Sequence, residues 1–291
     1  MAGPPYESDV LLVPADAERA QLPAAIGLSP ARFFPPATAS TSDGLVCVGG
    51  RLSPEWLLDA YMHGIFPWPV WDDEPMAWWS LDPRAVLELD GLHISRRLHR
   101  TLRSEKFAVT CNRNFSAVIE GCSRGKGREE GTWLTPAMMD AYRELHRLGY
   151  AHSIEVWLPS IKSFSLTSPN SSLLPSPTGR GAGSEGLLLS NDEEAHSLVG
   201  GIYGVALGGL FAAESMFHTA RDASKIGLAH LVAHLRQRGY QLLDIQQWTP
   251  HTGNLGAIEI SRLEYLRRLA VAIALPVTFG DALEGKTGDA S

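Results

Sequence analysis

Hydrophobic and polar positions change period along the chain, which predicts helices mixed with strands. Residues 44–50 form a short apolar run closed by glycines, a pattern typical of a strand. Residues 53–64 follow helical spacing, begin with Ser-Pro and end at Gly, as expected for a helix with Ser as its N-cap. The same signals predict helices over residues 95–104 and 135–149.

The second half of the sequence combines a hairpin with further helices. Residues 152–156 alternate between apolar and polar, as a half-buried strand does. Two apolar runs, 198–207 and 210–217, meet at Gly208-Gly209, and this junction predicts a β-hairpin. We also predict a helix over residues 222–238, a strand over 241–246 and a last helix over 261–274. Strands mixed with helices favour an α+β fold, a mixed α/β arrangement with a mixed sheet.

Three segments have no periodicity. Residues 1–22, rich in Ala and Pro, predict a flexible lead-in, and residues 277–291, rich in Gly and acids, predict a flexible tail. Residues 158–196 are dense in Ser, Pro, Gly and Leu, which predicts a low-complexity insertion. Because lengthening a loop costs little free energy, we expect this insertion to hang free of the fold.

The composition is that of a globular protein whose charge is concentrated locally. Of 291 residues, 44% are hydrophobic and 20% charged, and the formal net charge is −7. Contact with nucleic acid therefore needs a basic patch. Residues 93–106 supply Arg96, Arg97, Arg100, Arg103 and Lys106 against a single Glu. On a helix, Arg96, Arg100 and Arg103 share a face that suits a phosphate backbone, although a solvated face with crossed ion pairs gives the same pattern.

Cysteine usage and the lack of long apolar runs bear on the compartment. Cys47, Cys111 and Cys122 form no CxxC pair and are odd in number, which favours a reducing compartment. The sequence has no secretory leader pattern and no run of roughly 18–20 apolar residues. We therefore expect a cytoplasmic protein without membrane contact, with a monomer as the default state.

Two familiar motifs occur without the context or the residues that their functions require. Residues 181–186 match GxGxxG but follow a Pro/Ser tract, which disfavours a dinucleotide site. His230 and His234 are four residues apart on a predicted helix, but Leu231 stands where a zinc hydrolase carries Glu. We predict neither a metal nor a cofactor.

Five residues stand where side chains often form sites. Asp244 and Gln246 end a predicted strand, and the two-residue period places them on one face, a position that also suits a cap or loop anchor. Glu214 interrupts an apolar strand, so it must find a donor or face a cavity, and we favour the cavity. Trp68 and Trp133 are placed to stack on bases at a pocket rim, although aromatic residues more often fill a core.

Short segments spread over roughly residues 33–270 together form the pattern of one family. They include GIFPW at residues 64–68, WWSLDPRAV at 78–86, HSIEVW at 152–157 and ESMF at 214–217. With the Asp244–Gln246 segment, they resemble the bacterial leucyl/phenylalanyl-tRNA–protein transferases. The sequence departs from the family pattern at Arg51, at Ile245 and in the insertion.

The resemblance implies a small N-terminal α/β domain, which we place at residues 23–82, and a domain of acetyltransferase-like (GNAT-like) fold at residues 83–276. It implies transfer of Leu or Phe from aminoacyl-tRNA to proteins that begin with Arg or Lys, which marks them for degradation. We expect Met to be transferred more weakly, because one methylene discriminates only modestly in an apolar pocket.

Site residues follow from the resemblance by motif. Asp244 and Gln246 would form the catalytic pair and Glu214 would help to order it. Our own hypothesis for the mechanism is that Asp244 forms a hydrogen bond with the acceptor amine and Gln246 orients it. The tRNA backbone would contact Arg96, Arg97, Arg100 and Arg103. The aminoacyl side chain and the terminal adenosine would contact Tyr61, Trp68, Trp133, Ile202, Phe211, Met216, Leu228 and Leu243.

Two other functions stay open on the residues alone. An acetyl-CoA-dependent acetyltransferase would share the fold, but the pyrophosphate-binding loop of such enzymes does not occur in a segment predicted to be ordered. An RNA-binding protein without activity would use the basic helix and would leave Asp244 and Gln246 without a role. The aminoacyltransferase hypothesis explains more residues than either.

Overall fold

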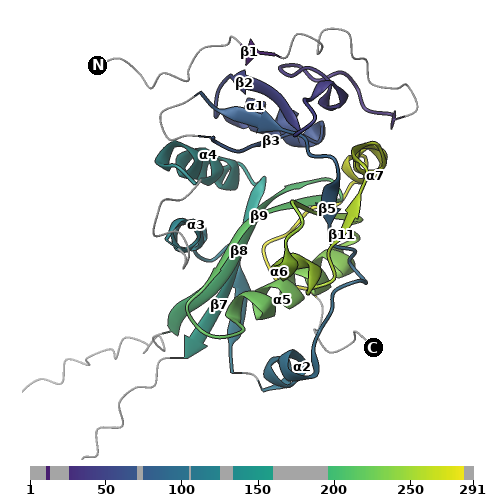
Figure 1. Ribbon diagram of the computed structural model, residues 1–291. Coiled ribbons are helices and arrows are strands. Elements are labelled where there is room, and N and C mark those ends of the chain that lie inside the picture. The colour runs from purple at the N-terminus through teal and green to yellow at the C-terminus, as the bar shows by residue number, and fades with distance from the viewer. Residues whose placement is uncertain are drawn as a thin grey trace, which may run out of the picture.

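The described part of the protein forms two sheets with helices packed on them (Figure 1). The computed structural model describes residues 11–13, 26–70, 75–104, 106–124, 134–159 and 196–284. The smaller sheet is antiparallel and has the strand order β1-β2-β4-β3. The larger sheet is mixed, with the order β11-β5-β10-β9-β8-β7-β6. The predicted α+β fold with a small N-terminal unit is confirmed.

In its described residues, the N-terminal unit has an aromatic core that packs against helix α1. Its elements are β1 (Leu11–Leu12), the 3₁₀ turn Ala37–Ala39, β2 (Leu45–Gly49), α1 (Pro54–Met62), β3 (Phe66–Pro67) and β4 (Ala77–Trp79). Trp56 of α1 packs against Trp78 and Phe34. Gly64, just after α1, has a φ of +74°, a conformation that favours glycine, and a Cβ there would lie 2.6 Å from Leu266 Cδ2.

The large sheet contains one parallel pair. Its strands are β5 (Arg84–Val86), β6 (Ala108–Cys111), β7 (Ala151–Pro159), β8 (His196–Leu207), β9 (Leu210–His218), β10 (Leu242–Gln246) and β11 (Ile258–Ile260). The predicted hairpin is confirmed as β8 and β9, which turn at Gly208-Gly209. Strands β9 and β10 are parallel. A parallel pair needs a crossover connection, and α5 (Ala223–Arg238) provides it.

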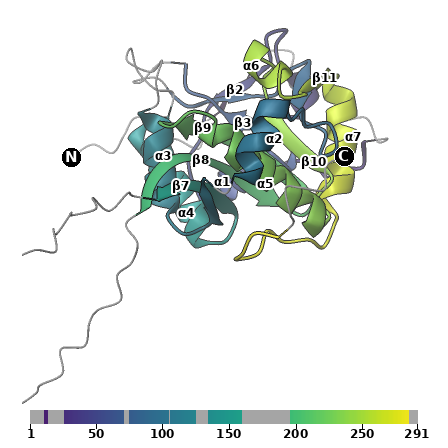
Figure 2. The same cartoon turned by 90° about the horizontal axis from the view of Figure 1, so that it is seen from below.

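Helices cover both faces of the large sheet, as Figures 1 and 2 show. Helices α3 (Phe115–Ser123) and α4 (Pro136–Arg147) lie on one face and α5 on the other. Alternate residues of β8 pack against the helices on opposite faces of the sheet, because successive side chains of a strand point to opposite faces. Tyr203 and Val205 belong to the same hydrophobic cluster as residues of α3 and α4, whereas Ile202 and Ala206 belong to the cluster of α5.

The five predicted helices are confirmed, each to within about two residues. The predictions over 53–64, 95–104, 135–149, 222–238 and 261–274 correspond to α1, α2 (Arg96–Arg103), α4, α5 and α7 (Arg262–Ile273). Ser95, Thr135 and Ser261 accept a backbone N–H at the start of their helices. Helices α3 and α6 (Pro250–Gly253) were not predicted. None of the described helices combines the length and the apolar character that crossing a bilayer requires.

Two of the segments predicted to be flexible contain residues that form part of a β-strand. Leu11 and Leu12, inside the predicted lead-in, pair with Gly49 and Val48 as strand β1. The predicted insertion starts too early, because Leu158 and Pro159 still pair with the first residues of β8. Residues 160–195, and with them the GxGxxG match, lie outside the described residues.

The predicted flexible tail is wrong for residues 277–284. Phe279 is 2% exposed and stacks on His152, with ring centroids 4.3 Å apart. His234 Nε2 lies 2.8 Å from the Phe279 carbonyl oxygen, and its Nδ1 accepts from the Glu284 backbone N–H. Thus His234, half of the rejected metal motif, anchors the tail. Burial of the Phe279 ring stabilises this segment on the fold, although the residues around it are rich in Gly and acids.

We expect Phe279→Ala to destabilise the protein by about 3 kcal/mol, because it removes a buried aromatic side chain and leaves a cavity. Urea denaturation measures the change. The matched control is Asp281→Ala in the same segment, where the side chain is exposed, and we expect a change within about 0.5 kcal/mol. Equal effects of the two substitutions would contradict a packed tail.

Candidate active site

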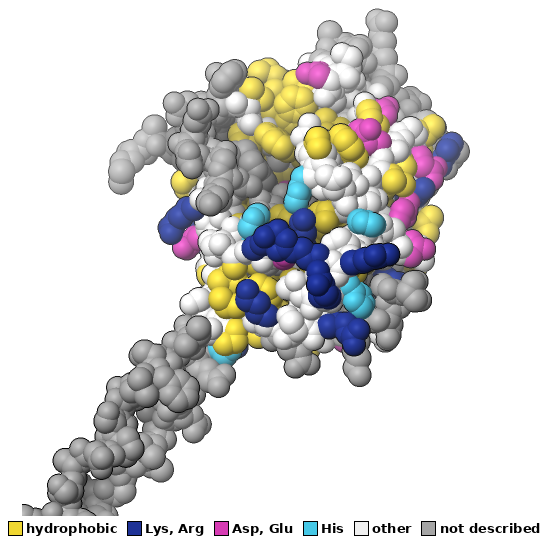
Figure 3. Space-filling model, turned by 60° about the horizontal axis from the view of Figure 1, so that its bottom comes forward, with side chains coloured by type: hydrophobic (Ala, Val, Ile, Leu, Met, Phe, Trp, Pro, Cys, Tyr) yellow, Lys and Arg dark blue, Asp and Glu magenta, His cyan; other side chains and the backbone are white. Residues whose placement is uncertain are grey.

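A basic surface is centred on α2. Arg96, Arg97, Arg100 and Arg103 are all exposed, whereas Leu98 on the same helix is 4% exposed. Figure 3 shows Lys and Arg side chains gathered on this face, with His side chains at its edges. Arg97 lies 3.5 Å from Asp222, just before α5. The helix thus buries its apolar side and presents its cations, as the sequence predicts.

A cavity of about 290 Å³ opens between the large sheet and the loop after β10. Its wall is mainly apolar and includes Leu87, Ile202, Met216, Leu228, Ile245 and Leu255. The polar side chains that reach it include Glu214, Gln246, Thr249 and Thr252, and Trp68, 37% exposed, is also part of its lining. The volume is at the lower end of ligand pockets, which run from about 300 to 1,000 Å³. The cavity suits one amino-acid side chain.

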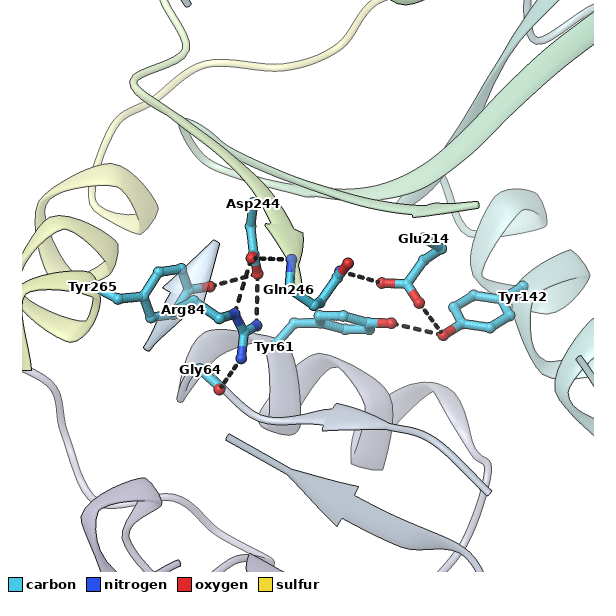
Figure 4. Close-up of polar contacts among 8 residues, drawn as sticks. All are labelled: Tyr61, Gly64, Arg84, Tyr142, Glu214, Asp244, Gln246 and Tyr265. Carbon is cyan, nitrogen blue, oxygen red and sulfur yellow. Dashed lines mark hydrogen bonds and ion pairs between the residues drawn. The ribbon is translucent and has the colours of Figure 1, made fainter. Parts of the chain in front are cut away.

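Asp244 is a fully buried acceptor beside this cavity. Its Oδ1 accepts from Arg84 Nε at 2.9 Å and from the Gln246 backbone N–H at 2.9 Å. Its Oδ2 accepts from Arg84 Nη2 at 2.6 Å and from the Tyr265 hydroxyl at 2.8 Å (Figure 4). With 0% exposure and four donors, Asp244 holds its neighbours in place instead of making the predicted contact with an acceptor amine.

A bulge at the end of β10 turns Gln246 toward Glu214. The pairing of β10 with β5 shifts between Asp244 and Gln246, and Gln246 has a φ of +56°. The strict alternation that predicted one shared face therefore fails here. The Gln246 Nε2 donates to Glu214 Oε1 at 3.1 Å, whereas its Oε1 has no hydrogen-bond partner among the described residues. An amide oxygen that can accept a further donor thus lies at the cavity.

Glu214 ends a chain of hydroxyl donors. Tyr142 donates to Glu214 Oε2 at 2.9 Å, so the 2.7 Å contact between the two hydroxyls has Tyr61 as its donor. Burial raises the pKa of both tyrosines well above the ordinary value, which keeps the two protons in place. Burial also raises the pKa of Glu214 to about 7, and the two hydroxyls oppose that rise. Glu214 both finds donors and faces the cavity.

The geometry suits a reaction of an amine beside an apolar side chain. An amine at the cavity would donate to Gln246 Oε1, close to the carboxylate of Glu214, which favours positive charge there. No cluster of three or more His, Cys, Asp or Glu side chains suited to a metal ion occurs in the described parts of the chain. The polar side chains at the cavity include the amide of Gln246 and the carboxylate of Glu214.

The structure separates the predicted site residues into three groups. Glu214, Gln246, Trp68, Ile202, Met216 and Leu228 line the cavity. Phe211 and Leu243 are 1% exposed and lie in the hydrophobic cluster behind it, and Tyr61 takes part through its hydroxyl. Trp133 lies outside the described residues.

Sequence reasoning missed the partners that fix the site. Arg84 and Tyr265 hold Asp244, and Tyr142 holds Glu214. A buried acid on an apolar strand signals that a cation must be nearby, but Arg84 is 160 positions away and nothing local points to it.

Comparisons with known proteins identify the family of this chain. The profile of the leucyl/phenylalanyl-tRNA protein transferase family matches residues 86–161 and 190–270, and the profile of its N-terminal domain matches residues 50–82. A leucyl/phenylalanyl-tRNA–protein transferase of Magnetococcus marinus is 42% identical over 247 residues, which is 85% of this chain and 91% of the relative. The protein of the same name from Pseudomonas fluorescens is 43% identical over 239 residues, 81% of this chain and 89% of the relative. The chain belongs to the leucyl/phenylalanyl-tRNA–protein transferase family of aminoacyltransferases.

Proposed function

We propose that this chain transfers Leu or Phe, and Met more weakly, from aminoacyl-tRNA to the α-amine of proteins that begin with Arg or Lys, and so marks them for degradation in the cytoplasm. The observation that carries the proposal is the apolar cavity of about 290 Å³ that meets the amide of Gln246 and the carboxylate of Glu214. The names of the relatives support the donor and the protein acceptor.

The cavity wall accounts for the aminoacyl group. Ile202, Met216 and Leu228 give an apolar surface for an unbranched or γ-branched side chain. One methylene in such a pocket is worth only about 1–3 kcal/mol, which permits graded selectivity with Met as a weaker substrate. Trp68, exposed at 37%, offers a ring on which the terminal adenosine can stack.

The amine attacks an ester that is already activated. Its pKa of about 7.7–8.0 leaves a useful neutral fraction near pH 7, so positioning dominates. The C–N bond forms as the amine attacks the ester carbonyl carbon, and the C–O bond to the ribose breaks. The surplus amine proton ends on the departing ribose oxygen. Gln246 accepts from the amine, and Glu214 stabilises the positive charge that develops on it.

The proposal is tested by transfer of radiolabelled Leu from charged tRNA to a protein that begins with Arg and to the same protein beginning with Ala. Transfer to the Arg protein alone supports it. Equal labelling of both proteins would contradict the acceptor preference. No labelling of either, with tRNA bound, would contradict the activity and leave an RNA-binding protein.

We propose that the exposed arginines of α2 contact the tRNA backbone. The double substitution Arg96→Ala and Arg100→Ala should weaken tRNA binding and flatten its salt dependence by about one unit of log–log slope for each lost phosphate contact. Binding assays from low to moderate salt measure this slope. The matched control is Arg124→Ala, an Arg directly after α3 that is 78% exposed. An unchanged slope in the double variant would contradict the contact.

A further inference from the structure

A second cavity adjoins the first. It has a volume of about 260 Å³ and is lined by Asp43, Phe66, Trp68, Trp79, Leu81 and Gln247. Trp68 and Gln247 line both cavities, so the two share a wall. Gln247 also directly follows Gln246 in the chain. A molecule with its amine at Gln246 therefore has this second cavity within reach of its side chain.

A rigid turn holds Asp43 at this cavity. Thr41 and Leu45 close the turn, with the Thr41 N–H donating to the Leu45 carbonyl at 2.8 Å and the Leu45 N–H donating to Thr41 Oγ1 at 3.0 Å. Gly44 has a φ of +98°, and a Cβ there would lie 2.9 Å from Leu81 Cδ2, so the turn packs closely against Leu81. The hydroxyl of Thr41 donates to Asp43 Oδ1. Asp43 Oδ2 has no hydrogen-bond partner among the described residues and is left for a ligand.

The lining of the second cavity is that of a cation site with an apolar wall. Its lining includes three aromatic rings, and the face of an aromatic ring attracts a cation within about 6 Å of its centroid. The Arg84 guanidinium already lies 4.6 Å from the centroid of the Phe66 ring, so Trp79 is the ring that we assign to a cation from the acceptor. Leu81 and the rings suit an aliphatic stem, while an exposed carboxylate suits a charged tip. Arg and Lys side chains combine these two parts. A purine base would also stack on the rings, but it carries no positive charge to match Asp43.

We propose that Asp43, with the ring of Trp79, binds the basic side chain of the first residue of the acceptor protein. This inference rests on the proposed function and deepens it by giving the acceptor preference a site. The α-amine lies at Gln246 and Glu214, and the side chain extends past Gln247 into the second cavity. Asp43 is thus a specificity-determining residue that lies outside the reacting groups.

The test compares acceptor peptides that begin with Arg and with citrulline, which has the same shape without the charge. For the wild type we expect kcat/KM to be about fivefold higher with Arg, the factor that about 1 kcal/mol gives for a solvent-accessible ion pair. Asp43→Asn keeps an oxygen that can accept from Thr41, and we expect it to bring this ratio close to one through the acceptor KM. The matched control is Asp140→Asn, whose side chain is 76% exposed on α4, and it should keep the wild-type ratio.

Each outcome decides between the proposals. If the wild type prefers Arg and Asp43→Asn retains that preference, the site at Asp43 is wrong and the proposed function stands. If Asp43→Asn changes the KM for aminoacyl-tRNA and leaves the Arg-to-citrulline ratio unaltered, the cavity holds the terminal base instead. If the wild type labels no peptide at all, it is the proposed function that fails.

Discussion

Asp244→Asn is expected to destabilise the protein by about 3–5 kcal/mol and to abolish most of its activity. The substitution leaves the guanidinium of Arg84 buried without its counter-charge, and removing one partner of a buried ion pair has an effect of about this size. It also replaces one of the two acceptor oxygens by an NH2 group, so either the Tyr265 hydroxyl or the Gln246 backbone N–H loses its acceptor, which weakens the support of the bulge that orients Gln246. Urea denaturation and steady-state kinetics on the same preparation measure both effects.

The fold offers a matched control for this ion pair. Glu88 and Arg268 are also 2.6 Å apart, but their side chains are 37% and 36% exposed, against 0% and 1% for Asp244 and Arg84. Glu88→Gln should therefore cost no more than about 1 kcal/mol. The double variant Asp244→Leu with Arg84→Met should regain much of the stability and remain inactive. Equal losses for Asp244→Asn and Glu88→Gln would show that burial of the pair has no importance.

Glu214→Gln is expected to lower kcat/KM about a hundredfold above pH 7, the loss typical of removing one group that stabilises transition-state charge. The difference in kcat/KM between the wild type and Glu214→Gln should become smaller at lower pH. Burial raises the pKa of Glu214 to about 7, so the carboxylate is charged above pH 7 and becomes protonated as the pH falls below it. The wild type then comes to resemble the neutral glutamine variant, with its advantage shrinking about tenfold per pH unit.

The measurement is the ratio of wild-type to variant kcat/KM between pH 5.5 and pH 8.5. The ratio cancels the titration of the acceptor amine, which both enzymes share. Glu155→Gln serves as the control, since this carboxylate is 0% exposed on β7 and accepts from Ser153 and Thr110 away from the cavity. A Glu214 ratio that stays level over the whole range, or that grows toward low pH, would rule out the charged form as the active one.

Local signals predicted those elements of the fold whose ends are marked in the sequence. The hairpin at Gly208-Gly209 and the helices capped by Ser95, Thr135 and Ser261 were found because turn and cap residues act within a few positions. Helix α3 was missed, although Asn114 caps it through its Oδ1. Its nine residues include Gly121, so its helical pattern is weak. The tail was misjudged because burial of Phe279 depends on His152 and α5, which composition cannot reveal.

The sequence was sufficient to predict the polar side chains of the site, but not the groups that orient them. Asp244, Gln246 and Glu214 stand out as polar residues on apolar strands, a signal visible within each strand. The bulge at Gln246 and the ion pair to Arg84 arise from contacts between segments far apart in sequence. Strict alternation therefore gave Asp244 a contact with substrate, whereas its four partners make it a buried support.

The hydrogen-bonded groups of the site also set when, during its synthesis, this protein can first become active. Tyr61 lies near the start of the chain and Tyr265 near its end, so about 200 residues separate the first and last hydroxyls. At a translation rate of roughly 5–20 residues per second, the ribosome needs on the order of 10–40 s to join them. A nascent chain that has not yet reached α7 leaves Asp244 short of one partner. Products that terminate before α7 therefore lack one of the groups that support the site.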